Sequence, residues 1–373
     1  MTTTHFPWRA HTADLPSVGT PADSLRSRGE AGGPGARLAA VRIQAETFRR
    51  EFATTGTPDG ITTCDLVTLP YPTRFGLFRA STAIAPFLSI TNRMLVIRWR
   101  ESNGRPRTLL FEPSDVDRGQ HTPYFVALAR RTPDFVRRRV VVEHGTVLGH
   151  LARLGITPES VDYLMFDHLH TQDVRRWVGT TTYQADLQAR PEAVFPNAKL
   201  IVQRDELAAM AELHPLQRPW YQEATYRDVP PEAFLPIDGS IVLGPGIAIV
   251  KTPGHVFGNQ SLVLNTSTGI WVSSENVIAT ECLTPEHSRM PGLARWSREW
   301  QQEVILNANS IESTADQYNS LILEKTLADR SQVDSRFLQF FPSSELTAAW
   351  TNPGTAPTFV HRAIVHEASS AER

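Results

Sequence analysis

The stretch that decides the fold is residues 163–173, which read YLMFDHLHTQD. Its first four residues are apolar, which is typical of a short strand buried on both faces. His168 and His170 follow directly, and two histidines at i and i+2 on extended backbone point to the same side. Both imidazoles can therefore face one metal ion, at the strand end where α/β folds place their ligands.

Two further strand ends carry residue types that bind metals. The segment TPGH (252–255) follows an apolar run, and its proline–glycine turn would hold His255 at the strand end. Glu275 follows the run GIWV (269–272), which reads as the second half of a hairpin that returns this carboxylate towards His255. Neutral imidazoles with an anionic oxygen ligand suit zinc, iron or manganese. Each piece alone is typical of a cap or turn, but the three together favour a metal site.

Composition sets the broad class. The 373 residues carry a formal net charge of −2 and are 41% hydrophobic, which allows a sizeable core and gives no global attraction to nucleic acid or an anionic membrane. The two cysteines exclude a cysteine-built zinc site and a disulfide scaffold. No apolar run approaches the roughly 20 residues that span a bilayer, and the N-terminus lacks the apolar stretch of a secretory signal. We therefore expect a cytoplasmic enzyme acting on a small molecule, with neither nucleic-acid nor membrane partners and an open oligomeric state.

The alternation of strand and helix patterns predicts one layered α/β domain. We expect residues 1–55 to be a disordered or loosely packed N-terminal extension, 56–345 to be the domain, and 346–373 to be a C-terminal extension. A helical composition over 36–52 falls inside the first of these. Strands are expected at 61–69, 93–99, 107–111, 163–166, 199–202 and 336–341, and two helices within 296–327.

The order and spacing of the motifs resemble the metallo-β-lactamase fold superfamily of metal-dependent hydrolases. The resemblance covers about residues 60–345 and implies an αββα four-layer sandwich. It also points to the N-acyl-homoserine lactonase branch. The segments that carry it are LGITP (154–158) with VDYL (161–164), FPNA (195–198) with VQRDE (202–206), and TPGH (252–255) with GNQSL (258–262).

Carried over residue by residue, the resemblance implies a first metal site. His168, His170 and His255 match the ligands of the first metal, and Glu275 takes the place of the bridging aspartate. The expected metal is zinc, as one or two ions, with iron or manganese as alternatives.

The second metal site departs from the family pattern. Gln172 stands where the family has an aspartate, and glutamine does not ionise. Ser344 stands where a late histidine is expected, unless His361 or His366 reaches back. Asp173 is expected to replace the missing aspartate as a metal ligand and, like Glu275, as a catalytic general base. A helix-capping role for Asp173 has equal weight. We predict one tightly bound metal and a second site that is weak or absent.

Three functions fit this pattern. The first is metal-dependent hydrolysis of an ester, lactone or related acyl bond through a metal-bound hydroxide. The second is a mononuclear non-haem iron oxygenase that uses His168, His255 and Glu275. The third is a non-catalytic family member. The side chains of Trp220, Tyr221 and His287 are expected to contact substrate, with local packing as the alternative.

Overall fold

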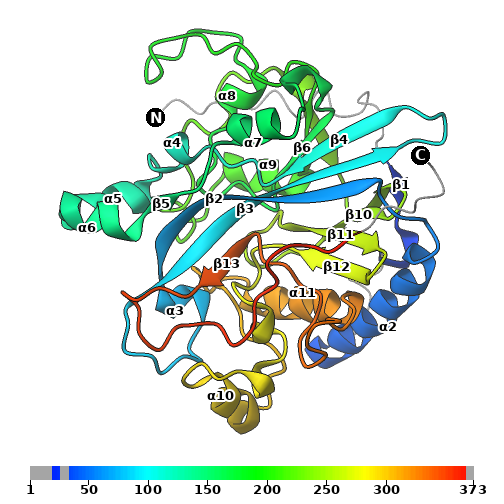
Figure 1. Ribbon diagram of the computed structural model, residues 1–373, viewed down its shortest axis with the longest axis vertical. Helices are drawn as coiled ribbons and strands as arrows, with labels where there is room; N and C mark the ends of the chain where they lie inside the picture. Colours follow the sequence, from blue (N-terminus) through cyan, green and yellow to red (C-terminus); the bar gives the residue numbers. More distant parts are fainter. Residues whose placement is uncertain (1–18, 26–32, 367–373) are drawn as a thin grey trace.

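Two β-sheets lie face to face between layers of helices in the computed structural model, which describes residues 19–25 and 33–366 (Figure 1). The larger sheet has eight strands: seven follow the order β5-β2-β3-β4-β6-β7-β8, and β13 lies off this path and pairs with β3. Strands β2, β3 and β4 are antiparallel, whereas β4, β6, β7 and β8 are parallel. The bounds are β5 Val142–Glu143, β2 Gly60–Pro72, β3 Phe87–Arg100, β4 Pro106–Phe111, β6 Tyr163–Met165, β7 Lys199–Gln203, β8 Phe234–Ile237 and β13 Ser344–Thr347.

The smaller sheet is antiparallel throughout, in the order β1-β9-β10-β11-β12. Its strands are β1 Thr20–Pro21, β9 Ile241–Gly244, β10 Ile247–Lys251, β11 Gln260–Thr266 and β12 Gly269–Ser273. The predicted hairpin that leads to Glu275 is confirmed by the pairing of β11 with β12.

Alternating side chains explain why both faces of each sheet are buried. In β10, Ile247 and Ile249 pack into the core between the sheets, whereas Ala248 and Val250 pack against the helices outside. Both sets are apolar, since successive side chains point to opposite faces and neither face meets water. The predicted four-layer αββα sandwich is therefore confirmed.

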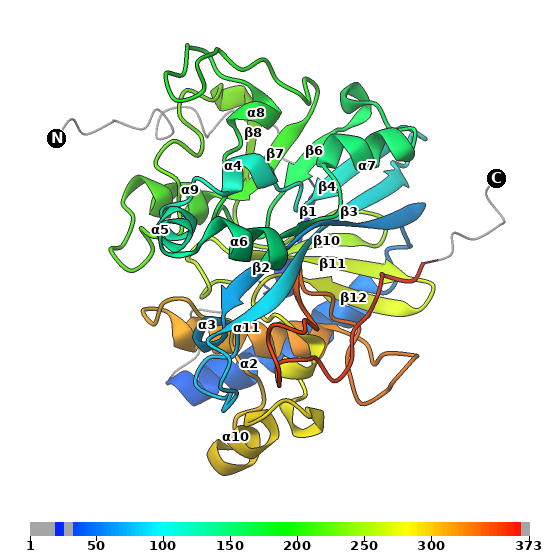
Figure 2. The ribbon, with the colours of Figure 1, turned by 60° about the vertical axis from the view of Figure 1, so that its left-hand side comes forward.

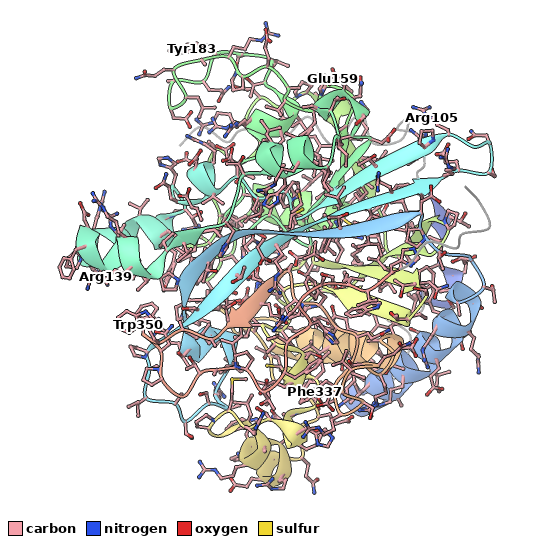
Figure 3. The ribbon with its side chains drawn as sticks, in the orientation of Figure 1. Arg105, Arg139, Glu159, Tyr183, Phe337 and Trp350 are labelled. Carbon is pink, nitrogen blue, oxygen red and sulfur yellow. The ribbon has the colours of Figure 1, made fainter. Side chains whose placement is uncertain are left out.

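The helices form the two outer layers. Helices α2 (Pro34–Phe52) and α11 (Thr314–Leu327) cover the smaller sheet, and α7 (Val147–Arg153) and α9 (Arg204–Ala211) cover the larger one (Figure 1). The shorter helices are α3 Thr73–Gly76, α4 Val116–Gly119, α5 Pro123–Arg131, α6 Asp134–Val140, α8 Arg175–Val178 and α10 Leu293–Trp300. Helices α5 and α6 project from the body of the molecule (Figures 1 and 3), with Arg139 on the outlying α6, and the view in Figure 2 brings them to the front. Among the described residues, no helix is both long and apolar enough to cross a membrane.

Helix α2 corrects the expected N-terminal extension. Val41, Ala45, Phe48 and Phe52 recur at helical spacing and are buried in the core beside α11, so residues 34–52 belong to the packed fold. Composition alone does not predict the packing of this helix, because one of its four buried residues is the small Ala45. The rest of the expected extension, residues 1–18 and 26–32, lies outside the described residues.

The C-terminal part of the domain also differs from expectation. Residues 336–341 are not a strand, since they make only isolated bridges through Leu338 and Phe340. Phe340 packs in the core beside the helices, and Phe341 packs between the sheets. The run is apolar because both of its faces are buried, although it forms no continuous ladder of backbone hydrogen bonds with a neighbouring strand. The last strand is β13, and Ile364 beyond it is buried in the inter-sheet core. The two predicted helices within 296–327 are confirmed as α10 and α11.

Candidate metal centre

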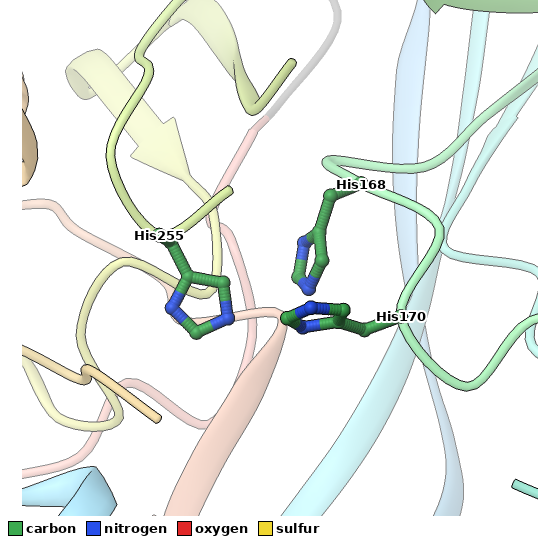
Figure 4. A group of neighbouring side chains, drawn as sticks. All are labelled: His168, His170 and His255. Carbon is green, nitrogen blue, oxygen red and sulfur yellow. The ribbon is translucent and has the colours of Figure 1, made fainter. Parts of the chain in front are cut away.

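Three histidines converge where the two sheets meet (Figure 4). His168 and His170 lie in the loop after β6, and His255 lies in the turn after β10. All three side chains are buried, and one ring nitrogen from each lies within 4.8 Å of the others. The ring centroids are 4.5 to 5.3 Å apart. We call these residues the histidine trio.

The turn that carries His255 requires its glycine. Gly254 has a φ of +132°, and a Cβ there would lie 2.0 Å from the backbone nitrogen of Gln317 on α11. Only glycine allows this approach without strain. The TPGH sequence therefore seats the turn directly on α11 and directs the imidazole inward.

Each histidine of the trio has one ring nitrogen engaged by a protein acceptor and the other directed at the centre. This arrangement fixes ring orientation and is common among metal-binding histidines. His168 Nε2 is buried and has no hydrogen-bond partner, which a metal ion would satisfy. The acceptors are Asp167 Oδ1 for His168 Nδ1 at 2.5 Å, Gln217 Oε1 for His170 Nε2 at 2.8 Å, and the Asn307 carbonyl oxygen for His255 Nδ1 at 2.7 Å.

Burial keeps two of the rings neutral, as metal ligands must be. It lowers the pKa of His255 to about 3 and holds the pKa of His170 well below its usual value. Burial also opposes protonation of His168, but the charge of Asp167 and its hydrogen bond outweigh it and raise the pKa of His168 to about 9. Of the three histidines, His168 is therefore the one whose ring is stabilised by a neighbouring carboxylate, that of Asp167.

Glu275 is brought to the trio as expected. Its Oε2 lies 3.6 Å from His168 Nε2, and its side chain is 20% exposed to the cavity. Burial raises the pKa of Glu275 to about 7, although the charge of His168 works against this rise. Asp167, His168 and Glu275 make a second group of potential ligands within 4.8 Å.

Asp167 connects the segments of the centre. Besides His168, it accepts hydrogen bonds from the Glu275 backbone N–H at 2.7 Å and from Ser343 Oγ at 2.8 Å, both at Oδ2. Behind it, Glu112 Oε1 accepts the Asp167 backbone N–H at 2.6 Å. Burial holds the pKa of Glu112 well above its usual range, and the neighbouring charge of Asp167 adds to this effect. Glu112 is thus a neutral acid next to a buried carboxylate.

Glu206 braces the loop between the two paired histidines. This buried residue of α9 accepts the Leu169 backbone N–H at 2.8 Å and the Tyr221 hydroxyl at 2.7 Å, both at Oε1. Tyr221 packs edge-on against His170, with 4.7 Å between the ring centroids. The Tyr221 hydroxyl is therefore used in support of the loop, and the residue does not line the cavity.

Asp173 does not join the trio, which corrects its expected role as a ligand and general base. Its two carboxylate oxygens accept hydrogen bonds from the Arg175 guanidinium at 2.9 and 2.7 Å, and Oδ2 also accepts one from Arg118 Nε at 3.1 Å. Oδ1 further accepts the Arg175 backbone N–H at the start of α8. Asp173 precedes Val174, the N-cap of α8, which has no side-chain cap hydrogen bond, so the carboxylate is held by a buried ion pair and by the Arg175 backbone N–H.

The positions that depart from the family pattern do lie at the centre. Gln172 and Ser344 both line the cavity, and Gln172 Nε2 donates to Ser114 Oγ at 3.0 Å. Neither side chain supplies an ionisable ligand. His361 and His366 do not replace the late histidine, because their ring nitrogens bond the backbone oxygens of Leu338 and Pro58.

Of the other residues expected to contact substrate, Trp220 lines the cavity and His287 does not. Trp220 lines the cavity and stacks on Tyr124 at 4.3 Å between ring centroids. His287 lies beside Phe337, whose ring centroid is 6.4 Å away, and it does not line the cavity. Only Trp220 of the three therefore stands where a substrate could touch it.

The cavity above the trio has a volume of about 640 Å³ and lies within the usual range for small-molecule sites. Its floor is the metal centre, and an apolar wall is formed by β2 and the projecting helices α5 and α6. The apolar wall residues include Val67, Leu69, Phe125, Leu128, Ala129, Val140 and Val141.

Reasoning from the sequence missed the supporting residues. Asp167 lies directly before His168 in the segment 163–173, and this position could have indicated its role. Glu206 lies in VQRDE (202–206), in the first turn of α9. Gln217 and Asn307 lie in irregular loops, where neither spacing nor periodicity marks them. Gln217 also donates to the His255 carbonyl oxygen at 3.3 Å, so it joins both halves of the trio.

No protein-family model matches the chain. Among curated proteins it is similar to an N-acyl homoserine lactonase of Bacillus cereus, with 28% identity over 133 residues, and to one of Bacillus thuringiensis, with 28% over 126 residues. Each match covers 34% of this chain and 42% of the relative, so the similarity spans about two fifths of the relatives' length.

Solved structures with a similar arrangement are more distant in sequence. A probable metal-dependent hydrolase from Staphylococcus aureus matches at a TM-score of 0.49 and 12% identity, over 83% of this chain and 99% of that chain. An N-acyl homoserine lactone hydrolase with N-hexanoyl-L-homoserine at its catalytic metal centre matches at 0.43 and 17%, over 66% and 90%. The curated relatives confirm the resemblance to the N-acyl homoserine lactonases, and the observed architecture is the four-layer αββα sandwich that the resemblance implies.

Proposed function

We propose that this protein is a metal-dependent hydrolase that cleaves an ester, lactone or related acyl bond of a small molecule. The observation that carries the proposal is the convergence of three buried histidines, one of them with a ring nitrogen that has no hydrogen-bond partner, at the floor of a large cavity. The similarity to N-acyl homoserine lactonases supports the choice of an acyl bond.

The trio would hold the metal, and Glu275 would add an acidic ligand. Three imidazoles and an oxygen ligand suit zinc best, and we expect one ion. When bound, such an ion supplies a Lewis acid that polarises a carbonyl and lowers the pKa of water. The iron oxygenase alternative needs two histidines and one carboxylate, and the presence of His170 in the same cluster favours the hydrolase.

The chain's own groups supply orientation and a proton acceptor. Glu275 lines the cavity and lies beside the trio, so we assign it the acceptance of a proton from the attacking water. Asp167 orients His168 through Nδ1 and Glu275 through its backbone. Trp220 and the apolar wall would exclude water around an apolar part of the substrate. A cytoplasmic location stays a prediction.

Metal analysis of two matched histidine variants tests the proposal. His255→Ala removes a trio member, whereas His361→Ala removes another buried histidine, one that bonds a backbone oxygen away from the centre. We expect about one zinc ion per chain in the unmodified protein and in His361→Ala, and loss of both zinc and lactone or ester hydrolysis in His255→Ala. Unchanged zinc content and turnover in His255→Ala would contradict the proposal. Iron with oxygen-dependent turnover would support the oxygenase instead.

A further inference from the structure

A second cavity lies beside the catalytic one. It has a volume of about 350 Å³ and is formed by α3, the residues that follow it, and the segment 308–311 before α11. Asn309 lines both cavities. The lining residues are Thr73, Arg74, Phe75, Leu77, Phe78, Arg79, Ser81, Ala308, Asn309, Ser310 and Ile311.

Two arginines give this second cavity its charge. Across residues 19–25 and 33–366, no carboxylate lies within 4.0 Å of the guanidinium of Arg74 or Arg79. The guanidinium carbon of Arg74 lies 4.5 Å from the centroid of Phe75, and that of Arg79 lies 5.0 Å from the centroid of Phe78. Stacking occupies the flat face of a guanidinium and leaves the N–H groups at its edge free to bind an anion.

The rest of the lining combines apolar side chains with the polar Thr73, Ser81, Asn309 and Ser310. Leu77 and Ala308 are buried, and Phe75, Phe78 and Ile311 present hydrocarbon surface to the cavity. A highly hydrated inorganic anion would leave this surface uncovered, whereas a carboxylate attached to an apolar body would cover it and meet the arginines together.

We propose that this cavity is a second binding site, which takes a small carboxylate with an apolar body. The carboxylate bonds the guanidinium edges of Arg74 and Arg79, and the body packs on Leu77 and the phenyl rings. The site contains no residue of the metal centre, so the proposal does not depend on the proposed hydrolysis.

The second site is joined to the metal centre by direct contacts. The Phe75 ring meets Trp220 edge-on at 5.5 Å between centroids, and the Phe75 carbonyl oxygen accepts the Ala308 backbone N–H at 3.0 Å. In the same segment, Ser310 Oγ accepts a hydrogen bond from Gln217 Nε2 at 3.0 Å, and Gln217 in turn holds His170. An occupant of the second site therefore contacts the segment that orients the metal-binding loop.

Titration calorimetry of the full chain with phenylacetate tests the proposal. We expect saturable binding of one phenylacetate per chain, weakened about tenfold or more in Arg74→Gln/Arg79→Gln, because this variant removes the charge-assisted hydrogen bonds of both guanidinium groups. Arg130→Gln/Arg131→Gln removes the same charge from exposed positions of α5 and should bind as the unmodified chain does. Ser81→Asp, which adds a carboxylate to the lining, should also abolish binding.

Several results would overturn the proposal. They are no saturable binding to the unmodified chain, equal binding of 2-phenylethylamine, or phenylacetate binding that is unchanged in both Arg74→Gln/Arg79→Gln and Ser81→Asp. The last result would place the carboxylate at the metal centre. The calorimetry measures binding and not turnover, so its result can be interpreted even if the protein proves not to be a hydrolase.

Discussion

Replacing Asp167 with asparagine should weaken metal binding at the trio without removing a ligand. The aspartate accepts three hydrogen bonds, from His168 Nδ1, the Glu275 backbone N–H and Ser343 Oγ. Asparagine keeps the shape but turns one acceptor oxygen into an NH₂ donor. Ser343 can rotate its hydroxyl to accept, but the Glu275 backbone N–H cannot, so one orientation of the amide leaves two donors facing each other.

The other orientation harms the metal site more directly. With the NH₂ group towards His168, Nδ1 of that ring must become an acceptor, and the proton moves to Nε2, the atom that faces the centre. Loss of a hydrogen bond to a charged group costs about 1.5–3 kcal/mol. Loss of a residue that orients a ligand typically lowers metal affinity about 10–100-fold, which is the same range expressed as a binding constant. We therefore expect zinc affinity to fall about 10–100-fold.

Competition with a chromophoric chelator measures this affinity. Asp228→Asn is the matched control, since Asp228 accepts hydrogen bonds from Thr182 and Gln184 and does not line the catalytic cavity. Zinc affinity in the control should equal that of the unmodified chain. If Asp167→Asn binds zinc as tightly as the control, the assignment of Asp167 as the residue that orients His168 is wrong.

Three further predictions concern other parts of the structure. Gln172→Asp restores an ionisable group to the cavity wall and should raise zinc content above that of the unmodified chain; unchanged stoichiometry by elemental analysis would contradict this. Phe48→Ala leaves a hole under α2 and should lower the free energy of unfolding in urea by about 3–5 kcal/mol, whereas an exposed, loosely packed helix would give almost no change. Burial raises the pKa of Glu324 from 4.5 to about 7, so its protonated form stabilises the fold below pH 4.5, and this contribution is lost as the pH rises to 7. Glu324→Gln should therefore reduce the fall in unfolding free energy over that interval by about 3 kcal/mol, and parallel curves for variant and unmodified chain would refute it.

The strand ends could be predicted from sequence because they combine two local signals. An apolar run followed within a few residues by histidine or a carboxylate marks both a buried strand and the segment that leaves it. That logic placed His168, His170, His255 and Glu275, which the fold brings together. It depends only on neighbours along the chain and on the rule that ligands gather at strand ends.

Long-range partners could not be predicted in the same way. The sequence predicts Asp173 as a metal ligand and general base, but Arg118, 55 residues away, and the neighbouring Arg175 bind it. The run at 336–341 has strand composition, yet its neighbours in space leave it without a ladder. Helix α2 is expected from sequence to lie in a loosely packed extension, because its burial depends on contacts with α11, which is more than 260 residues away. In each case a contact distant in sequence decides the role of a residue.

The distribution of acidic groups explains why the centre is suited to one tightly held ion. Gln172 removes a negative ligand from the cavity side, and Asp173 is held by arginines outside it. Negative charge is instead placed behind His168, where Asp167 bonds Nδ1 and the neutral acid Glu112 bonds the Asp167 backbone. A carboxylate in this position raises the basicity of the imidazole and strengthens its bond to a first ion. Glu275 lines the cavity with its Oε2 3.6 Å from His168 Nε2, and a single carboxylate with water is a weak site for zinc.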